Sequence, residues 1–143
     1  MAIRRANAEW SGDLKNGKGE MALESGAFSG AYSFASRFED GTGTNPEELI
    51  GAALAGCFSM ALSHMLAESG ATPKNVATTA RVTLDQVGDD FAITGIELET
   101  KADVPGISDD QFQKHAHNAK KNCPVSKALG GTEIKLNACL TNA

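Results

Sequence analysis

The chain has 143 residues, the usual size of one domain, and this length can bury a hydrophobic core without disulfide staples. Its net charge of −5 disfavours nucleic acid or an anionic membrane as a partner, because both usually require a basic patch. No apolar run approaches the ~20 residues of a membrane span. Residues 1–14 have no apolar stretch after their two arginines and do not resemble a secretory signal. We therefore expect a cytoplasmic protein with a single domain over residues 1–143.

The first forty residues are predicted to form three strands. The first ends near Trp10, and a second is expected over residues 20–28. Residues 31–38 alternate, with aromatic side chains on one side and Arg37 on the other. This alternation is typical of a half-buried strand.

A long helix is predicted to follow. Asn45 suits the N-cap, Pro46 suits the first helical position, and Glu48 lies three residues after the cap. Gly70 is the expected residue just beyond the end of the helix. Residues 49–65 are apolar or small nearly all the way round the helix, which indicates a central helix that is buried on all sides and packed by a neighbour.

The second half of the chain is predicted to contain two strands, a helix and a last strand. Two alternating runs flank a turn at Gly88, and a change of phase in the second run predicts a β-bulge near Gly95. Ser108 and Gln111 form a capping box for the next helix. The remaining elements are expected at residues 109–122 (helix), 124–129 (short helix) and 133–140 (strand). The predicted order is β-β-β-α-β-β-α-β, an α+β fold with hairpins.

Cys57 lies midway along the long helix. An apolar environment raises the pKa of a thiol, and the N-cap, twelve residues away, is too distant to lower it. A reactive Cys57 therefore requires a cation brought to it through space, and Arg37 is the best candidate. The alternatives are that Cys57 is a small core residue and that Arg37 is solvated on an edge strand.

The other two cysteines differ in their surroundings. Cys123 ends the helix at residues 109–122 and continues its inward stripe. Because Pro124 follows, Cys123 is also expected at the N-terminal end of a short helix, where N–H groups favour a thiolate. A core role and a functional role for Cys123 both stay open on this evidence. Cys139 falls on the polar side of the last strand and is interpreted as non-catalytic.

Glu47 is the candidate carboxylate. In a straight helix it lies ~15 Å along the axis from Cys57, so it cannot touch that thiol directly. Three possibilities remain: Glu47 orients Arg37, the helix is broken, or Glu47 comes from a partner chain.

The spacing of the three histidines, His64, His115 and His117, matches no zinc motif. The chain has no CxxC pair either. We expect no metal and no cofactor.

Two segments carry a resemblance to a known family. GTNPEELIGAALAGCFSMALSHMLAESG (residues 43–70), followed by NCPVSKAL (residues 122–129), resembles the OsmC/Ohr family of hydroperoxide reductases. The segments AEWSGDLKNGKG, RFEDG and VPGI are more similar to the OsmC branch. The resemblance covers nearly the whole chain. It implies an OsmC-like fold, in which an intertwined homodimer wraps two central helices in antiparallel sheet.

The resemblance also implies roles for four residues. Cys57 would be the reactive cysteine, Cys123 the resolving cysteine, Arg37 the residue that stabilises the thiolate, and Glu47 the residue that holds Arg37. The implied enzyme reduces a hydroperoxide through a Cys57 sulfenic acid and a Cys57–Cys123 disulfide. An external dithiol, which the resemblance suggests is of the lipoyl type, would reset it.

Substrate preference and two rival functions stay open. An apolar pocket lined by the long helix and by Phe58, Met60 or Phe38 would favour organic over inorganic peroxides. The rivals are a thiol redox sensor that turns over slowly and a non-catalytic dimeric protein with inert thiols.

Overall fold

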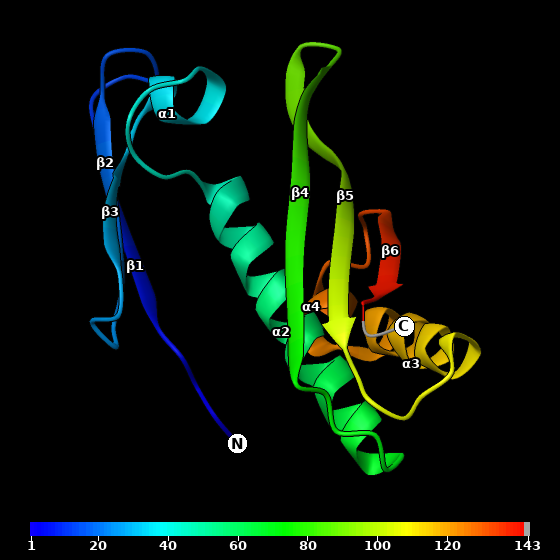
Figure 1. Cartoon of the computed structure of the whole chain (residues 1–143). Helices are drawn as coiled ribbons and strands as arrows, with labels where there is room; N and C mark the ends of the chain where they lie inside the picture. Colours follow the sequence, from blue (N-terminus) through cyan, green and yellow to red (C-terminus); the bar gives the residue numbers. More distant parts are fainter. Residues whose placement is uncertain (142–143) are drawn as a thin grey trace. The chain divides into compact units, whose positions relative to one another are not determined.

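The computed structural model describes residues 1–141 and divides into two compact units, one over residues 1–49 and one from Ile50 onward (Figure 1). The elements in chain order are β1 (Ala6–Ser11), β2 (Lys18–Leu23), β3 (Ser29–Tyr32), α1 (Phe34–Phe38), α2 (Pro46–Glu68), β4 (Asn75–Val87), β5 (Asp90–Asp103), α3 (Asp109–Asn122), α4 (Pro124–Ala128) and β6 (Ile134–Leu140). The predicted α+β class is confirmed, and α1 is an addition to the predicted order.

The first unit is built on a three-stranded antiparallel sheet in the order β1-β2-β3. Trp10 of β1 and Tyr32 of β3 hold one end of it together, with ring centroids 5.3 Å apart. The backbone of Tyr32 also forms an isolated bridge to Thr44, just before α2. The sheet therefore anchors both α1 and the segment that enters α2.

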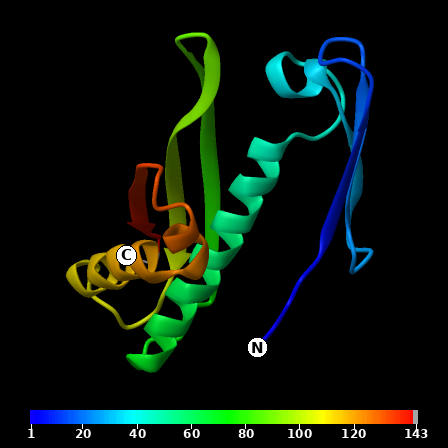
Figure 2. The same cartoon turned by 180° about the vertical axis from the view of Figure 1, so that it is seen from behind.

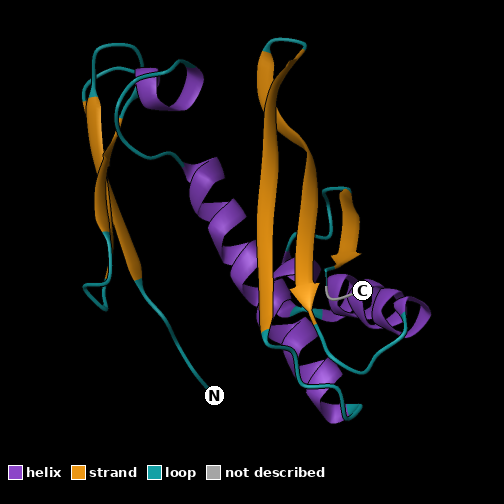
Figure 3. Ribbon diagram, in the orientation of Figure 1, coloured by secondary structure: helices purple, strands orange, loops and turns teal. Residues whose placement is uncertain are grey.

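Residues 34–38 form helix α1, so the strand predicted over residues 31–38 is wrong beyond Tyr32 (Figure 3). The helix starts at a capping box: Ser36 N–H donates to the Ser33 hydroxyl (3.1 Å), and Ser33 N–H donates to the Ser36 hydroxyl (2.8 Å). Aromatic residues four apart also share a helix face, and the rings of Phe34 and Phe38 lie in a tilted contact with centroids 4.9 Å apart. The sequence pattern of residues 34–38 therefore fits either a strand or a helix, and the capping box at Ser33 favours the helix.

The predicted start and end of α2 are confirmed. Asn45 Oδ1 accepts the N–H of Glu48 (2.8 Å), as an N-cap does, and Gly70 ends the helix with φ +92°. In a capping box the Glu48 carboxylate, three residues after the cap, would accept the N–H of Asn45, but it accepts the Thr44 hydroxyl instead (2.8 Å).

The second unit is a three-stranded sheet in the order β4-β5-β6, with α2 and α3 packed against one face (Figure 2). The predicted bulge is present. Thr83 pairs with Gly95 and Leu84 pairs with Ile93, so Thr94 is the extra residue.

The last strand corrects the expectation of a wholly antiparallel sheet, because β6 runs parallel to β5. Between them the chain passes through α3 and α4, and a crossover of this length returns a strand in the parallel direction. Two side chains of α3 then bind the backbone of β6: Gln113 Nε2 donates to Ala138 O (2.7 Å) and Lys120 Nζ donates to Ile134 O (3.0 Å). These bonds fix α3, and with it Cys123, against the sheet.

In the single chain, α2 is buried on one side only, so the expectation of burial all round is wrong for this chain taken alone. One side packs on the sheet and is fully buried: Leu54, Phe58, Leu62 and Leu66. The opposite side is exposed: Ala53, Gly56, Met60, His64 and Ala67. A helix with apolar residues on an exposed side calls for a second contact surface.

Helix α2 also corrects the expectation that no apolar segment approaches the length of a membrane span. Its best 18-residue window has a mean hydropathy of 1.7, so by length and composition alone it is long enough to cross a membrane. Core helices of soluble proteins pass the same test. One face of α2 packs on the sheet as such a core helix does.

Candidate active site

Two thiols from distant parts of the sequence meet in the second unit. Cys57, from the middle of α2, donates a hydrogen bond to Cys123, which links α3 to α4. Both are free thiols. Cys57 is half-buried, and Cys123 is only 1 % exposed. The structure therefore brings together the two cysteines that the sequence singled out.

Cys123 is held by the residues that follow it. Its Sγ accepts the N–H of Ser126 (3.4 Å) and lies 3.1 Å from the Ser126 hydroxyl. Burial alone would raise the pKa of Cys123. Hydrogen bonds from the Ser126 hydroxyl and N–H, with smaller contributions from Cys57 and the N–H of Val125, overcome that effect and lower the pKa of Cys123 below its ordinary value.

Cys57 has the opposite environment. Burial raises the pKa of Cys57, and the hydrogen bond to Cys123 raises it further because Cys57 keeps its proton there. The N–H of Val125 opposes both effects but does not cancel them. As argued from the sequence, the surroundings of Cys57 within its own unit keep the thiol neutral.

Arg37 and Glu47 form an ion pair in the first unit. Arg37 Nη2 donates to Glu47 Oε1 (2.7 Å), and Arg37 Nε lies 3.1 Å and 3.2 Å from the two carboxylate oxygens. The Glu47 side chain is 8 % exposed and that of Arg37 is 35 % exposed. Arg37 comes from α1 and Glu47 from the first turn of α2, so one chain supplies both partners. The carboxylate therefore fixes the guanidinium through Nε and Nη2, and the guanidinium also lies 5.3 Å from the centroid of the Phe38 ring.

The Arg37 side chain borders a cavity of about 230 Å³ in the first unit. Aromatic and aliphatic side chains make up most of the wall: Trp10, Leu14, Tyr32, Phe34 and Phe38, together with Ser33. Phe38 was expected in an apolar pocket, and it lines this one. Phe58 was also suggested, but it is fully buried in the core of the second unit. Met60 is 76 % exposed.

The remaining candidates are placed as follows. Cys139 is exposed and lies on the polar side of β6, as the sequence predicted. His117 Nδ1 lies 2.8 Å from Gln113 O on its own helix. Over residues 1–141, no three His, Cys, Asp or Glu side chains cluster so as to hold a metal ion.

Ser126 is the residue that the sequence reasoning missed. It is 7 % exposed and contacts Cys123 through both its hydroxyl and its N–H. A signal was present, because a serine three residues after a helix-starting residue has the spacing of a cap contact.

Comparison with known proteins shows the family of the chain. A family model described as OsmC-like protein matches residues 39–138. Peroxiredoxin OsmC of Escherichia coli K12 is 52 % identical over 127 residues, which cover 88 % of this chain and 89 % of that protein. An organic hydroperoxide resistance protein of Xanthomonas axonopodis pv. citri is 34 % identical over 92 residues, 64 % of this chain and 63 % of that protein.

A solved structure gives the same result for the fold. The organic hydroperoxide resistance protein OhrB of Bacillus subtilis superposes with a TM-score of 0.73 at 26 % identity, and the match covers 94 % of this chain and 97 % of that one. The fold is thus that of the OsmC-like and organic hydroperoxide resistance proteins. The chain belongs to the OsmC-like protein family.

Proposed function

We propose that the protein reduces organic hydroperoxides in the cytoplasm, with Cys57 as the attacking sulfur and Cys123 as the resolving thiol. The observation that carries the proposal is the hydrogen bond between these two thiols. The chain is a peroxidase-type enzyme, because its relatives are named peroxiredoxin and organic hydroperoxide resistance proteins.

The proposed cycle has three steps. The Cys57 thiolate attacks the outer peroxide oxygen, the O–O bond breaks, and the alkoxide leaves as an alcohol once protonated, giving a Cys57 sulfenic acid. The Cys123 thiolate then attacks the Cys57 sulfur, the S–O bond breaks, and the hydroxide leaves as water once protonated. An external dithiol, in our proposal of the lipoyl type, reduces the Cys57–Cys123 disulfide and becomes a disulfide itself.

Arg37 is proposed to supply the charge that Cys57 lacks in its own unit. A guanidinium within ~4–6 Å of a thiol favours the thiolate, and Glu47 already holds this guanidinium by two N–H groups. In the proposed active form, a homodimer, the ion pair lies against Cys57. The proposal assigns Glu47 to the same chain as Arg37, in line with the ion pair within this chain.

The substrate class follows from the cavity beside Arg37. Its wall is largely aromatic and aliphatic, which suits the organic part of a hydroperoxide better than water or hydrogen peroxide. We expect the purified protein to reduce cumene hydroperoxide or a lipid hydroperoxide faster than hydrogen peroxide. A clear preference for hydrogen peroxide would contradict this assignment.

The test is peroxide consumption by wild type, Cys57→Ser, Cys123→Ser and, as a matched control, Cys139→Ser. Cys57→Ser should be inactive. Cys123→Ser should complete one turnover and then stall or over-oxidise, because its sulfenic acid has no partner thiol. Cys139→Ser should behave as wild type, since Cys139 is exposed on β6.

The same assay separates the rival functions. Steady-state turnover with a dithiol donor contradicts a redox sensor, which would form the disulfide but turn over slowly. Undiminished peroxide consumption by Cys57→Ser would refute the proposed mechanism outright.

A further inference from the structure

Ser126 has two contacts with the same sulfur and little access to solvent. Its hydroxyl lies 3.1 Å from Cys123 Sγ, its N–H donates to that sulfur at 3.4 Å, and the residue is 7 % exposed. Cys123 also receives the hydrogen bond of the Cys57 thiol. Cys123 is therefore the common acceptor of donors from Cys57 and Ser126.

We infer that Ser126 is a positioning residue for the thiol chemistry: it holds Cys123 as the anionic partner of the pair, both when Cys123 attacks oxidised Cys57 and when Cys123 is expelled as the disulfide is reduced. This inference rests on the proposed function. It adds which sulfur of the Cys57–Cys123 disulfide the external dithiol attacks.

The resolving step needs a thiolate on Cys123, because the thiol form is a poor nucleophile. Burial alone would raise the pKa of Cys123, and the two donors of Ser126 reverse that effect. Burial, Cys57, Ser126 and the N–H of Val125 account for the lowered pKa, and no charged side chain of the described residues takes part. Ser126 is thus the main source of thiolate character on Cys123.

The reducing step receives a direction from the same contacts. A thiolate of the external dithiol can attack either sulfur of the disulfide, and the sulfur with the lower pKa leaves faster. Cys123 is the less accessible of the two, at 1 % exposed against a half-buried Cys57, and the Ser126 contacts stabilise it as a leaving thiolate. The dithiol therefore attacks Cys57, the S–S bond breaks, and Cys123 leaves as a thiolate held by Ser126. The second thiol of the dithiol then attacks the reductant sulfur that is bound to Cys57. Cys57 leaves, and the two sulfurs of the reductant form a disulfide.

The first test needs no enzymatic activity. In a Cys57→Ser/Cys139→Ser background only Cys123 can be alkylated, so its pKa follows from the rate of iodoacetamide labelling against pH. We expect a pKa below that of an ordinary cysteine, ~8.5. We expect Ser126→Ala to raise it by about one unit, the order of a lost hydrogen bond to a charged group. An ordinary or raised pKa with Ser126 in place would overturn the inference even if Ser126→Ala fails to fold. Failure of the proposed function would leave this result unaffected.

The second test measures disulfide closure and its pH profile in otherwise wild-type protein. Ser126→Ala should slow closure below neutral pH by about threefold, since a tenfold smaller thiolate fraction is partly offset by the greater nucleophilicity of a more basic thiolate. The difference should vanish at high pH, and Ser126→Thr should restore the profile. Thr100→Val removes another fully buried hydroxyl, in the sheet, and should leave the profile unchanged.

The direction of reduction is read from the mixed disulfide. Oxidised protein is treated with 2-mercaptoethanol, quenched with iodoacetamide and mapped by mass spectrometry. The inference expects the adduct on Cys57 and the alkyl group on Cys123. An adduct chiefly on Cys123, or a closure profile unchanged by Ser126→Ala, would overturn it.

Discussion

At the scale of single residues, the proposed chemistry requires a positive charge next to Cys57. Its own unit raises the pKa of Cys57 through burial and through the bond to Cys123. The first unit holds a guanidinium that Glu47 fixes at 2.7 Å. If Arg37 supplies the missing charge, the thiolate of Cys57 depends on a residue outside the packed core that surrounds it.

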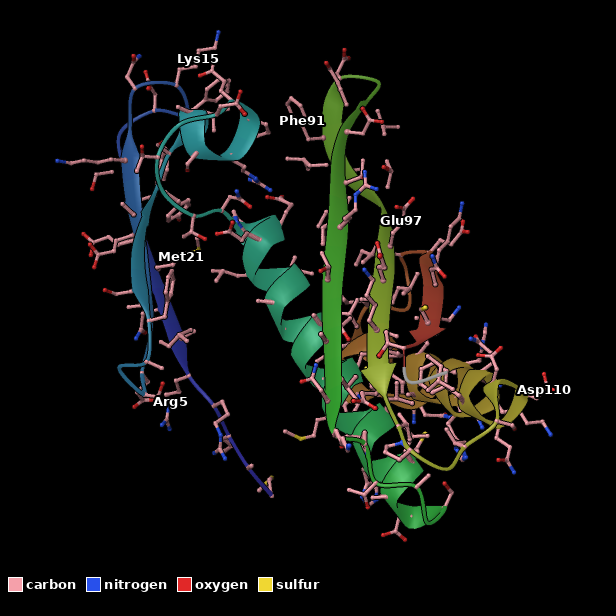
Figure 4. All side chains as sticks on the ribbon, viewed as in Figure 1. Arg5, Lys15, Met21, Phe91, Glu97 and Asp110 are labelled. Carbon is pink, nitrogen blue, oxygen red and sulfur yellow. The ribbon has the colours of Figure 1, made fainter. Side chains whose placement is uncertain are left out.

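Replacing Arg37 by alanine tests this dependence. An opposite charge lowers a thiol pKa by one to three units, so Arg37→Ala should shift the Cys57 alkylation profile to higher pH and slow labelling at pH 7 by about tenfold or more. The matched control is Arg81→Ala. Arg81 also forms an ion pair, with Glu97 at 3.3 Å (Glu97 is labelled in Figure 4). The side chains of this pair are 78 % and 60 % exposed. Equal profiles for Arg37→Ala and wild type would show that Arg37 does not act on Cys57.

The residue scale also shows what the sequence could predict about the site. Four site residues stand out because their side chains can ionise and because they fall in the segments that resemble the OsmC/Ohr family: Cys57, Cys123, Arg37 and Glu47. Ser126 does not stand out, because a serine carries no charge and its effect depends on a contact at 3.1 Å. Residue type predicts which side chains can react, whereas the order in which two thiols ionise depends on the atoms in contact with each sulfur.

At the scale of elements, the predictable parts are those with their own start and stop signals. The caps at Asn45 and Ser108 predicted α2 and α3, and both helices begin there. The change of phase near Gly95 predicted the bulge. Helix α1 was missed because a five-residue segment is too short to distinguish the two-residue period of a strand from the 3.6-residue period of a helix. The direction of β6 depends on the whole crossover rather than on the strand itself.

Helix α1 places Arg37, so its cap should matter for reactivity as well as stability. Ser33→Ala removes the capping hydroxyl and should lower the free energy of unfolding by about 1 kcal/mol. It should also slow Cys57 labelling, because Arg37 loses its fixed position. Denaturant unfolding and alkylation rates measure the two effects.

Ser108→Ala is the matched control for that experiment. Ser108 caps α3 in the same way, because its hydroxyl accepts the N–H of Gln111 at 3.3 Å. It should cost a similar ~1 kcal/mol while Cys57 labelling stays as in wild type. If both variants slow labelling equally, the effect is one of general stability and α1 has no special part in the site.

At the scale of the whole molecule, the exposed side of α2 is the feature that one chain leaves unexplained. Most of this side is apolar or small, with Met60 at 76 % exposed and Gly56 open to solvent, with nothing within 4 Å of a Cβ added there. The sequence predicted burial on every side, and a single chain provides only one of those sides. A second copy of the chain, with the same surface, would satisfy the pattern by a two-fold contact.

Substitution of Ala53 tests this homodimer. Ala53→Lys puts a charge on the exposed side of α2, and an unpaired charge buried at an interface costs several kcal/mol, enough to dissociate a dimer at micromolar concentration. Sedimentation equilibrium should give a dimer for wild type and a monomer for Ala53→Lys. Ala27→Lys, the same change at an exposed position in the turn between β2 and β3, should stay dimeric. Peroxidase activity per chain should fall with dissociation, because the proposed active form brings Arg37 to Cys57 only in the assembled protein. A monomeric wild type with full activity would contradict both the dimer and that account of the site.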